Sequence, residues 1–415
     1  MLTREQNELL CQVSGGAPMG ELLREFWMPA VRSQALVADG APVRVRLMGE
    51  NFVAFRATDG RVGFFDEGCP HRCTSLALAR NEDNALTCIF HGWKIDVSGK
   101  VVEVPSEPPE RRSEFAAKVR VRHYPVHEAG GALWVYLGRR QAPQFYNFEF
   151  NLLPRTQVRA VRALVHCNWL QGLEGLLDSA HFGILHQSFV SQRATDDRFS
   201  THDQGPVFKL MAQPYGLREG ALRKVEADVN YLRIREVVMP FYSFIPFDRP
   251  PWQMICVIPI DDEWSAQWVF RYDHSKPISD DDQERWLRLR GTEDSDNFCA
   301  EMADWHAPGF QNRQAMKEGH WSGLPKFFYE DFAAQVSMGP MADRTREYLG
   351  SSDSIITHAR QMLMRALRDH ARGEPAFGQD RALDYSRLRA VSIRYRGELD
   401  WRAIDPLKPP PPVEG

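Results

Sequence analysis

The sequence has little of what marks a membrane, secreted or nucleic-acid-binding protein. It has no apolar run near the roughly 18 residues of a membrane span, and its first residues, Met1-Leu2-Thr3-Arg4-Glu5-Gln6, lack the apolar core of a signal peptide. The 7 cysteines in 415 residues argue against a disulfide framework. The formal net charge of −4 provides no basic footprint for nucleic acid. These absences predict a protein of the reducing cytoplasm.

The composition is that of a globular protein with a large apolar interior. Hydrophobic residues make up 43% of the chain and charged residues 26%. The length suffices for two domains, and a polar, proline-containing stretch, 139–144, predicts the boundary between them. We expect an N-terminal helical segment over 1–27, a first domain over 28–140, a second over 141–405, and a proline-rich, exposed tail over 406–415.

Hydrophobic patterning predicts an all-β first domain and a mixed second domain. Short alternating runs such as Val43–Leu47 and Phe52–Phe55, separated by Gly and Asp turns, are typical of half-buried strands. The N-terminal helix over 3–28 should break near Gly15. In the second domain we predict strands over 158–165, 229–240, 252–260 and 266–272, and helices over 279–300 and 353–371. The fold class is therefore α+β.

Two short segments each combine one cysteine with one histidine: Cys69-Pro70-His71 and Cys88-Ile89-Phe90-His91. Two thiolates and two imidazoles can bind one Zn²⁺, or a [2Fe–2S] cluster with Cys on one iron and His on the other. Zinc fingers usually place both Cys in one arm and both His in the other, whereas each arm here supplies one of each. A mixed arm lets each loop reach both irons. The spacing therefore favours a Rieske-type [2Fe–2S] cluster, with zinc as the alternative.

The residues around this motif fit such a cluster. Pro70 stiffens the first loop, and Gly92 follows the second histidine, so backbone N–H groups can point at the sulfurs. Trp93 is expected to cover one side of the cluster. Cys73 lies outside the ligand pattern and is interpreted as a small buried apolar residue. Two neutral imidazoles in place of thiolates raise the reduction potential by several hundred millivolts, which suits an electron donor to an oxygen-activating metal.

A second set of ionisable residues interrupts the apolar segment Asn168–His186. At about 100° per residue, His181 lies about 60° to one side of Asp178, and His186 lies about 80° to the other. The imidazoles would diverge by about 140° on a straight helix. His186 must therefore lie near a bend or helix end, which Gly183 makes easier. Two His and one carboxylate form the facial triad that holds non-haem Fe(II) and leaves positions open for O₂ and substrate.

The carboxylate of this triad has more than one candidate. Asp178 is nearest in sequence, but Asp331, on a predicted helix, also fits and would free Asp178 to orient an imidazole. Glu330 and Asp343 are further candidates. Alternatively, the two histidines are polar residues of a core or helix cap, a reading that the Cys–His motif upstream disfavours.

Together these motifs resemble the terminal-oxygenase α subunits of Rieske non-haem iron ring-hydroxylating oxygenases, over about residues 5–370. Within that family the chain is most similar to the phthalate dioxygenase-like branch. The similarity is carried by Pro18–Leu22, Glu174–His181, Ser337–Arg344 and Gly350–Asp353. It implies an N-terminal all-β Rieske domain followed by a C-terminal helix-grip (START-like) catalytic domain with a curved antiparallel sheet.

The resemblance also implies cofactors and residue roles. The [2Fe–2S] cluster would be held by Cys69, His71, Cys88 and His91, and mononuclear Fe(II) by His181, His186 and Asp331. Asp178 matches a carboxylate that connects His181 to His91 of the partner subunit in a homotrimer or hexamer. Electrons would come from NAD(P)H through a separate reductase with flavin and its own [2Fe–2S] cluster. No G-x-G-x-x-G follows a predicted strand here, so we expect neither nicotinamide nor flavin on this chain.

The implied substrate is a small aromatic molecule, by preference an aromatic acid such as phthalate, chlorobenzoate, phenoxybenzoate or a methoxybenzoate. The implied reactions with O₂ are hydroxylation, dihydroxylation or, as an alternative, O-demethylation. A carboxylate needs a cationic partner, for which Arg159, Lys209, Arg233 and Arg235 are candidates. No arginine pair is evident in 239–246, which disfavours phthalate itself.

Three further interpretations remain open from the sequence. A group of aromatic residues predicts either a flat apolar pocket or ordinary sheet core: Tyr231, Phe241, Tyr242, Phe244 and Phe247. The chain could instead be a Rieske-type electron carrier, although such a carrier needs no second domain. It could also be a zinc-stabilised binding protein with no oxygenase activity.

Overall fold

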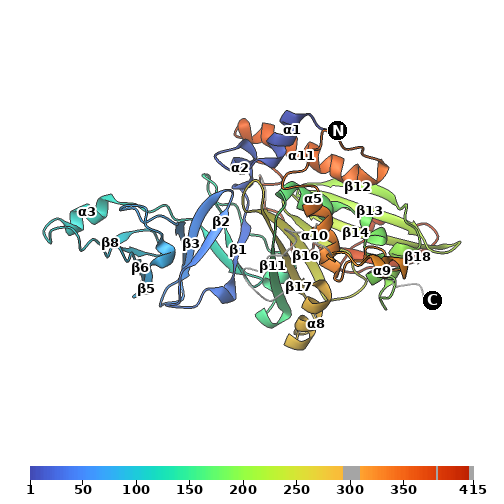
Figure 1. Cartoon of the computed structure of the whole chain (residues 1–415), viewed down its shortest axis with the longest axis horizontal. Helices are drawn as coiled ribbons and strands as arrows, with labels where there is room; N and C mark the ends of the chain where they lie inside the picture. The colour runs from blue at the N-terminus through green and yellow to red at the C-terminus, as the bar shows by residue number, and fades with distance from the viewer. Residues whose placement is uncertain (293–308, 380–381, 411–415) are drawn as a thin grey trace.

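The structure, a computed structural model, describes residues 1–292, 309–379 and 382–410. A small β unit lies at one end of the molecule, and a larger unit built on a curved sheet lies at the other (Figure 1). The predicted helix 279–300 is too long, because α8 (Asp280–Arg290) ends at Gly291, which takes a φ of 76°. Residues 293–300 of that prediction lie outside the described residues, as do residues 411–415 of the predicted tail. In the described part of that tail Pro406 is buried, whereas Lys408 is exposed as expected.

The N-terminal segment forms two helices, α1 (Arg4–Cys11) and α2 (Pro18–Leu23). Thr3 and Gln6 form a capping box at the start of α1. The predicted break falls at Gly15 and Gly16, whose φ angles of 62° and 79° favour glycine. Both helices lie against the long α11 (Ser354–Ala371), so the N-terminus packs on an element from the other end of the chain (Figure 1).

The first domain consists of three small antiparallel sheets, as its alternating pattern predicts. Their strand orders are β1-β10-β9, β2-β3-β4 and β5-β6-β7-β8. The elements are β1 (Met28–Arg32), η1 (Ser33–Ala35), β2 (Val43–Leu47), β3 (Glu50–Arg56), β4 (Val62–Asp66), η2 (Leu76–Leu78), β5 (Arg80–Glu82), β6 (Ala85–Thr87), β7 (Lys94–Asp96), β8 (Val101–Glu103), α3 (Arg112–Lys118), β9 (Val126–Ala129) and β10 (Ala132–Val135).

The second domain is built on an antiparallel sheet of eight strands in the order β11-β17-β16-β15-β14-β13-β12, with β18 paired to β14. The strands are β11 (Val158–Val165), β12 (Val207–Gln213), β13 (Gly216–Lys224), β14 (Val229–Val238), β15 (Tyr242–Ile245), β16 (Trp252–Pro259), β17 (Ser265–Tyr272) and β18 (Val391–Arg396). The helical elements are α4 (Glu149–Leu152), η3 (Arg155–Gln157), α5 (Trp169–Leu177), α6 (His181–Ile184), α7 (Gln187–Val190), η4 (Asp196–Thr201), α8 (Asp280–Arg290), α9 (Arg313–Lys317), α10 (Phe327–Ser337), η6 (Ser351–Asp353) and η7 (Trp401–Ala403), besides α11. The α+β class and the predicted strands are confirmed.

Close packing of α5 against the sheet positions the second set of ionisable residues. A Cβ atom on Gly172 would meet the Val257 side chain of β16 at 2.8 Å, and one on Gly175 would meet Gln335 of α10 at 2.9 Å. These two glycines therefore let α5 approach β16 and α10 closely. Asn168 caps the start of α5 and also bonds to the carbonyl oxygen of Cys11, which ties this helix to α1.

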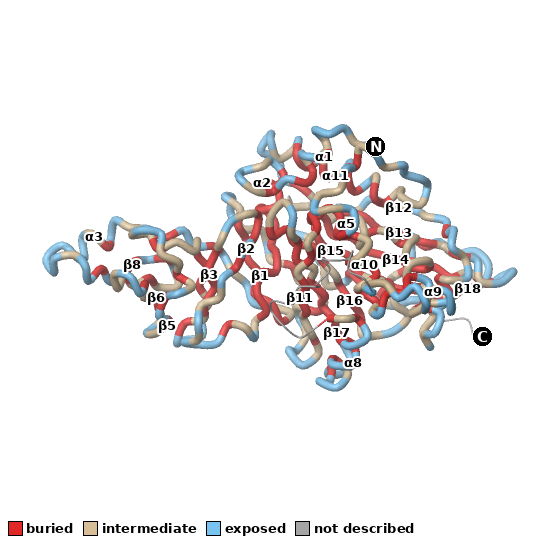
Figure 2. The backbone as a smooth tube through the Cα atoms, in the orientation of Figure 1, coloured by how far each residue is buried: buried red, intermediate tan, exposed pale blue. Residues whose placement is uncertain are grey.

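Buried residues form one large core that extends from the N-terminal helices through β1 and β10 into the large sheet (Figure 2). A separate core surrounds Cys69 and Cys88 at the far end of the small unit. No helix in the described parts of the chain has both the length and the apolar character needed to cross a bilayer.

Candidate metal centres and substrate pocket

The two Cys–His loops are tight hairpin tips that project from the small sheets. The backbone N–H of Cys69 donates to Thr74, and that of Cys73 returns to Cys69, each at 2.8 Å. In the second loop the N–H of Gly92 bonds to Cys88 at 2.9 Å, and Gly92 has a φ of 74°. These backbone hydrogen bonds close each loop on itself.

The four predicted cluster ligands converge with like donors paired. The Nδ1 atoms of His71 and His91 lie 3.1 Å apart, and the Cys88 side chain is near enough to Cys69 to raise the pKa of its thiol beyond the effect of burial. Both cysteines are buried, which raises the pKa of the Cys69 thiol to about 11. Two sulfurs on one side and two nitrogens on the other fit a [2Fe–2S] cluster with Cys on one iron and His on the other.

The surroundings of these loops agree with the sequence-based expectations in two respects and differ in one. Trp93 is buried and stacks on the His71 ring, with centroids 4.7 Å apart and planes at 8°, so it covers one side as predicted. Backbone N–H groups of His71 and Arg72 also point at the Cys69 sulfur. The prediction that Cys73 is buried is wrong. It is exposed and takes a φ of 58°, because it forms the turn that closes the loop.

The segment with the second motif is bent twice, and the bend at His186 is the one that the diverging imidazoles require. Helix α5 ends at Asp178, which is extended, and α6 starts at His181. His186 then lies at the junction between α6 and α7. The expected contribution of Gly183 to the bend is wrong: it is helical, and its lack of a Cβ serves close packing, since a Cβ would lie 2.0 Å from the Ser200 carbonyl oxygen.

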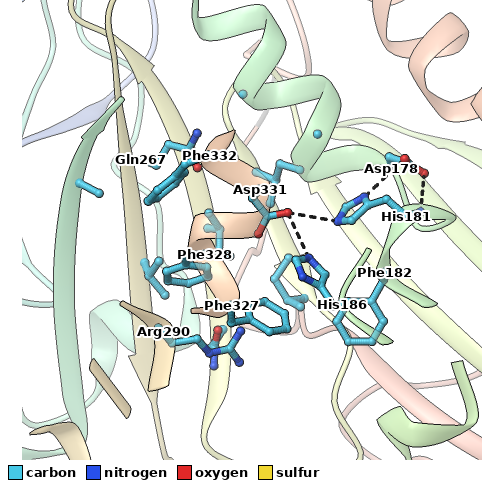
Figure 3. A pocket seen from close by; sticks show the side chains of 18 of the residues that line it. Asp178, His181, Phe182, His186, Gln267, Arg290, Phe327, Phe328, Asp331 and Phe332 are labelled. Atoms are coloured by element: carbon cyan, nitrogen blue, oxygen red, sulfur yellow. Dashed lines mark hydrogen bonds and ion pairs between the residues drawn. The ribbon is translucent and has the colours of Figure 1, made fainter. Parts of the chain in front are cut away.

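This double bend aims both imidazoles at the carboxylate of Asp331 on α10. Its Oδ1 lies 3.4 Å from Nε2 of His181 and 3.1 Å from Nε2 of His186 (Figure 3). One ligand atom from each of the three residues lies within 4.8 Å of the others. The structure thus brings together the three residues that the resemblance assigns to a mononuclear metal, in the 2-His-1-carboxylate set that suits non-haem Fe(II).

Two further carboxylates face the Nδ1 atoms of the imidazoles, on the side away from Asp331. Asp178 Oδ2 lies 3.4 Å from Nδ1 of His181, and Glu330 Oε2 lies 2.6 Å from Nδ1 of His186. Ser322 donates to the other oxygen of Glu330 at 2.5 Å. Such bonds fix the imidazole tautomers and leave both Nε2 atoms for a metal.

The alternative ligands are therefore placed elsewhere. Glu330 is fully buried and faces the far side of His186 from Asp331. Asp343 is exposed, and its carboxylate accepts hydrogen bonds from Thr345 instead. Sequence reasoning did not find Ser322, because a lone serine in a loop carries no pattern that links it to a glutamate on a later helix.

The charges of this site favour a bound cation. Burial lowers the pKa of His181, but hydrogen bonds and charges from Asp178 and Asp331 outweigh it and raise that pKa to about 9. For Asp331, burial acts to raise the pKa, but both histidines hold it well below its usual value. Three carboxylates around two imidazoles form a net negative set that a divalent metal ion would balance.

A cavity of about 90 Å³ opens beside these residues. Its walls come from the sheet and from α5, α8 and α10, and include the aromatic side chains Phe182, Phe247, Phe327, Phe328 and Phe332. Of the aromatic residues that the sequence proposed for a pocket, only Phe247 lines this cavity. Phe241, Tyr242 and Phe244 belong to the main core, and Tyr231 is buried beside Arg233.

The arginines in the cavity wall only partly match the candidates from the sequence. Arg233 and Arg235 do line it, together with Arg193 and Arg290, which the sequence did not single out. Arg159 points elsewhere, donating to the Ile278 carbonyl and to Asp280, and Lys209 is exposed on β12. These two candidates were wrong because patterning shows which face a strand residue takes but not which face holds the cavity.

Comparisons with known proteins agree with this architecture. A family model of the Rieske [2Fe–2S] domain matches residues 26–125, and one described as LigXa C-terminal domain like matches residues 135–408. The chain is 37% identical to the phthalate 4,5-dioxygenase oxygenase subunit of Pseudomonas putida, over 97% of this chain and 94% of that one. It is 34% identical to the 3-chlorobenzoate-3,4-dioxygenase oxygenase subunit of Comamonas testosteroni, over 97% of both chains.

A third relative and a solved structure extend the comparison. The 5,5'-dehydrodivanillate O-demethylase oxygenase subunit of Sphingobium sp. (strain NBRC 103272 / SYK-6) is 31% identical over 90% of this chain and 82% of that one. The structure of Pseudomonas putida CBB5 NdmA with caffeine shares the fold, with a TM-score of 0.60 at 17% identity, over 87% of this chain and 95% of that one.

These matches exclude a lone electron carrier and a zinc-stabilised binding protein, because they span both domains and are oxygenase subunits. The chain belongs to the Rieske non-haem iron oxygenases, as a terminal-oxygenase α subunit of the phthalate dioxygenase-like branch, with a [2Fe–2S] cluster and a mononuclear iron as cofactors.

Proposed function

We propose that this chain is the terminal oxygenase of a multi-component system that oxidises a small aromatic acid. The observation that carries the substrate class is Arg290 in the wall of the cavity. Its guanidinium lies 4.0 Å from the Phe327 ring centroid, and His186 stacks on the same ring at 4.0 Å. Figure 3 shows Phe327 between Arg290 and His186, so the cation lies across an aromatic ring from the proposed iron.

Arg290 differs from the other arginines of the cavity in having no carboxylate partner among the residues that the structure describes. Arg193 and Arg233 share Asp197, each at 2.8 Å, and Arg235 pairs with Glu219. Burial and the charge of Arg193 lower the pKa of Arg290 well below its usual value. A carboxylate on the substrate would supply the missing negative charge.

The remaining walls select the rest of the substrate. Phe182, Phe247 and Phe328 line the cavity together with aliphatic side chains of β11, β16 and β17. An aromatic ring between these side chains would be held by apolar contact while its acidic group reaches Arg290. The relatives named above are named for phthalate, 3-chlorobenzoate and 5,5'-dehydrodivanillate, which supports an aromatic acid as the substrate.

The experiment is a substrate panel with O₂ and a reductase. Phthalate, 3-chlorobenzoate and 4-methoxybenzoate are compared with their neutral amides, and products are identified as dihydrodiols, ring hydroxylation or released formaldehyde. Arg290→Gln is expected to raise KM for the acid by about 10- to 100-fold, as the loss of a charged hydrogen bond implies. Arg288→Gln is the control, because Arg288 is exposed on the same helix and pairs with Glu284. Equal turnover of acids and amides would refute the proposed substrate class.

The metal roles follow from the geometry of the donors. We propose Cys69, His71, Cys88 and His91 as the cluster ligands and His181, His186 and Asp331 as the Fe(II) ligands. When bound, the iron supplies the site for O₂, and the cluster supplies electrons to it. The chain's own residues hold the substrate ring in an apolar cavity, fix the imidazole tautomers through Asp178 and Glu330, and anchor an acid at Arg290.

The arrangement of the two sites supports electron transfer between subunits. Within one chain the cluster loops lie at the far end of the small unit, away from α6, α7 and α10 (Figure 1). Asp178 is half-buried beside His181 and lines a surface groove that also includes Met338 and Leu349. The cluster tip exposes Ile89 and Phe90 to solvent, by 59% and 56%.

An exposed apolar tip and a surface groove that contains Asp178 on the same chain favour head-to-tail contact in a closed ring. We propose a homotrimer, or a hexamer of two such rings, in which Asp178 connects His181 to His91 of the partner subunit. A separate NAD(P)H-dependent reductase with flavin and a [2Fe–2S] cluster would reduce the cluster. We also propose a cytoplasmic location, a Rieske domain over 28–140 and a catalytic domain over 141–405, with an N-terminal helical segment over 1–27 and a tail over 406–415.

A further inference from the structure

A buried ionic cluster lies on one face of β13 and β14, beneath the bend that carries Asp178. Every member of the cluster is at most 4% exposed: Glu219, Arg223, Arg233 and Arg235. Glu219 and Arg235 are direct cross-strand partners in the sheet register, and Arg235 Nε lies 3.6 Å from Glu219 Oε2. Burying charged side chains in this way is costly unless they are paired or hydrogen-bonded. The hydrogen bonds of these four side chains therefore indicate which parts of the chain they hold in place.

Three of these side chains bond to the residues on either side of Asp178. Arg235 donates to the carbonyl oxygen of Leu176 in the last turn of α5. Ser179 donates its hydroxyl to Glu219 Oε2 at 2.6 Å, and its own carbonyl accepts from Arg223 at 3.0 Å. The sheet therefore satisfies the carbonyls left over where α5 ends, and it fixes the chain before and after Asp178.

The Asp178 carboxylate is less firmly held than the imidazole next to it. Its Oδ1 accepts from the backbone N–H of Ala180 at 2.7 Å, and its Oδ2 faces His181 Nδ1 at 3.4 Å. His181 also faces Asp331 and would be bound by the metal. A small movement of the bend would thus displace Asp178 while the metal keeps His181 in place.

We propose that Ser179 and Glu219, with Arg235, are positioning residues that hold Asp178 in the geometry for electron transfer between subunits. The inference rests on the bridging role proposed for Asp178 above. Ser179 is the most direct test of it. Its hydroxyl makes the hydrogen bond to Glu219 Oε2, while Glu219 Oε1 has no hydrogen-bond partner among the described residues. Removing that hydroxyl leaves the turn residue next to Asp178 held by Arg223 but no longer by Glu219, without touching a metal ligand.

The experiment compares Ser179→Ala, Glu219→Gln and Asp178→Asn with the unaltered protein, each loaded with both metals. Each protein is reduced anaerobically and mixed with O₂ and 3-chlorobenzoate, and cluster oxidation is followed by stopped-flow absorbance. Iron per chain and the EPR spectrum of the nitric oxide adduct report whether the mononuclear site is intact. Ser265→Ala is the matched control, because Ser265 is fully buried on β17 and its hydroxyl faces Cys167 instead.

We expect Ser179→Ala to keep all its iron and its nitric oxide spectrum, while cluster oxidation slows about tenfold. Glu219→Gln keeps a carbonyl acceptor for Ser179 and should slow it less, and Ser265→Ala should match the unaltered protein. Iron loss in Ser179→Ala in proportion to its rate would show a merely structural role, and an unchanged rate would also overturn the inference. If Asp178→Asn itself transfers electrons at the normal rate, the bridging role fails and this inference fails with it.

Discussion

The four proposed cluster ligands come from two hairpin loops within residues 69–91. The proposed iron ligands instead come from α6, from the junction between α6 and α7, and from α10, which follows much later in the chain. The cluster loops have their own small core and close on themselves through backbone hydrogen bonds. The iron site instead depends on α5 packing against β16 and α10, and on three carboxylates aimed at two imidazoles. One site is thus local and held by its loops, and the other is built by the tertiary fold. The effects of a substitution should accordingly stay local at the cluster site and reach neighbouring elements at the iron site.

The largest effect is expected from the loss of an iron ligand, because the tertiary fold brings the iron ligands together. Asp331→Ala removes the carboxylate shared by both imidazoles, so we expect iron to fall from about three atoms per chain to about two, with activity abolished. The visible spectrum of the cluster should not change, because the cluster loops have their own core, separate from the residues around Asp331. A bleached cluster in this variant would contradict the independence of the two sites.

The next largest effect concerns the connection between the sites. Asp178→Asn keeps the size of the side chain and its acceptor oxygen for Ala180, but removes the charge beside His181. We expect full iron content and nearly complete loss of product formation, measured in steady-state turnover with reductase. Near-normal turnover would remove Asp178 from the electron path.

A smaller effect should follow from the carboxylate behind His186. Glu330→Gln replaces a charged acceptor at 2.6 Å by a neutral one, so His186 is oriented less firmly and becomes a weaker ligand. We expect affinity for Fe(II) to fall by about 10- to 100-fold, as measured by chelator competition. Ser337→Ala on the same helix is the control, since Ser337 is exposed and its hydroxyl bonds only to a backbone carbonyl. Unchanged iron retention would show that Glu330 does not act on His186.

The smallest effect is expected at the cluster loops. Trp93→Phe keeps a ring against His71 but loses the hydrogen bond from the indole to Ser106 at 3.1 Å. The cost should be about 1 kcal/mol, seen as faster bleaching of the cluster in urea with the mononuclear iron unaffected. If iron retention at the second site fell as well, the two regions would not be as separate as their cores indicate.

The same contrast explains how much the sequence reveals. Cys69, His71, Cys88 and His91 can be recognised in the sequence as proposed ligands because a local site places its ligands at short spacings. Strands such as β2 follow directly from apolar alternation. The bend at His186 is also predictable, since a straight helix cannot aim both imidazoles at one point. The sequence does not predict the bend at Asp178.

The other features of the site depend on tertiary contacts, which leave no pattern of spacing in the sequence. Arg290 is indistinguishable in sequence from the exposed Arg288 two residues before it, and only the packing of α8 against α10 places it in the cavity. Cys73 is predicted to be buried because isolated cysteines often are. It is exposed because closure of the loop gives it a positive φ, which the sequence does not indicate. The role of Gly183 is likewise set by the approach of Ser200, a contact that the sequence does not show.

The central claim, that the cluster of one subunit serves the iron of its neighbour, is tested most directly by mixing two inactive chains. Cys88→Ser lacks a working cluster, and Asp331→Ala lacks the mononuclear iron. The account predicts that each is inactive alone and that co-expressed, doubly tagged hybrids recover activity, because an intact cluster then faces an intact iron across the interface. Hybrids that assemble with all their expected iron and remain inactive would contradict it.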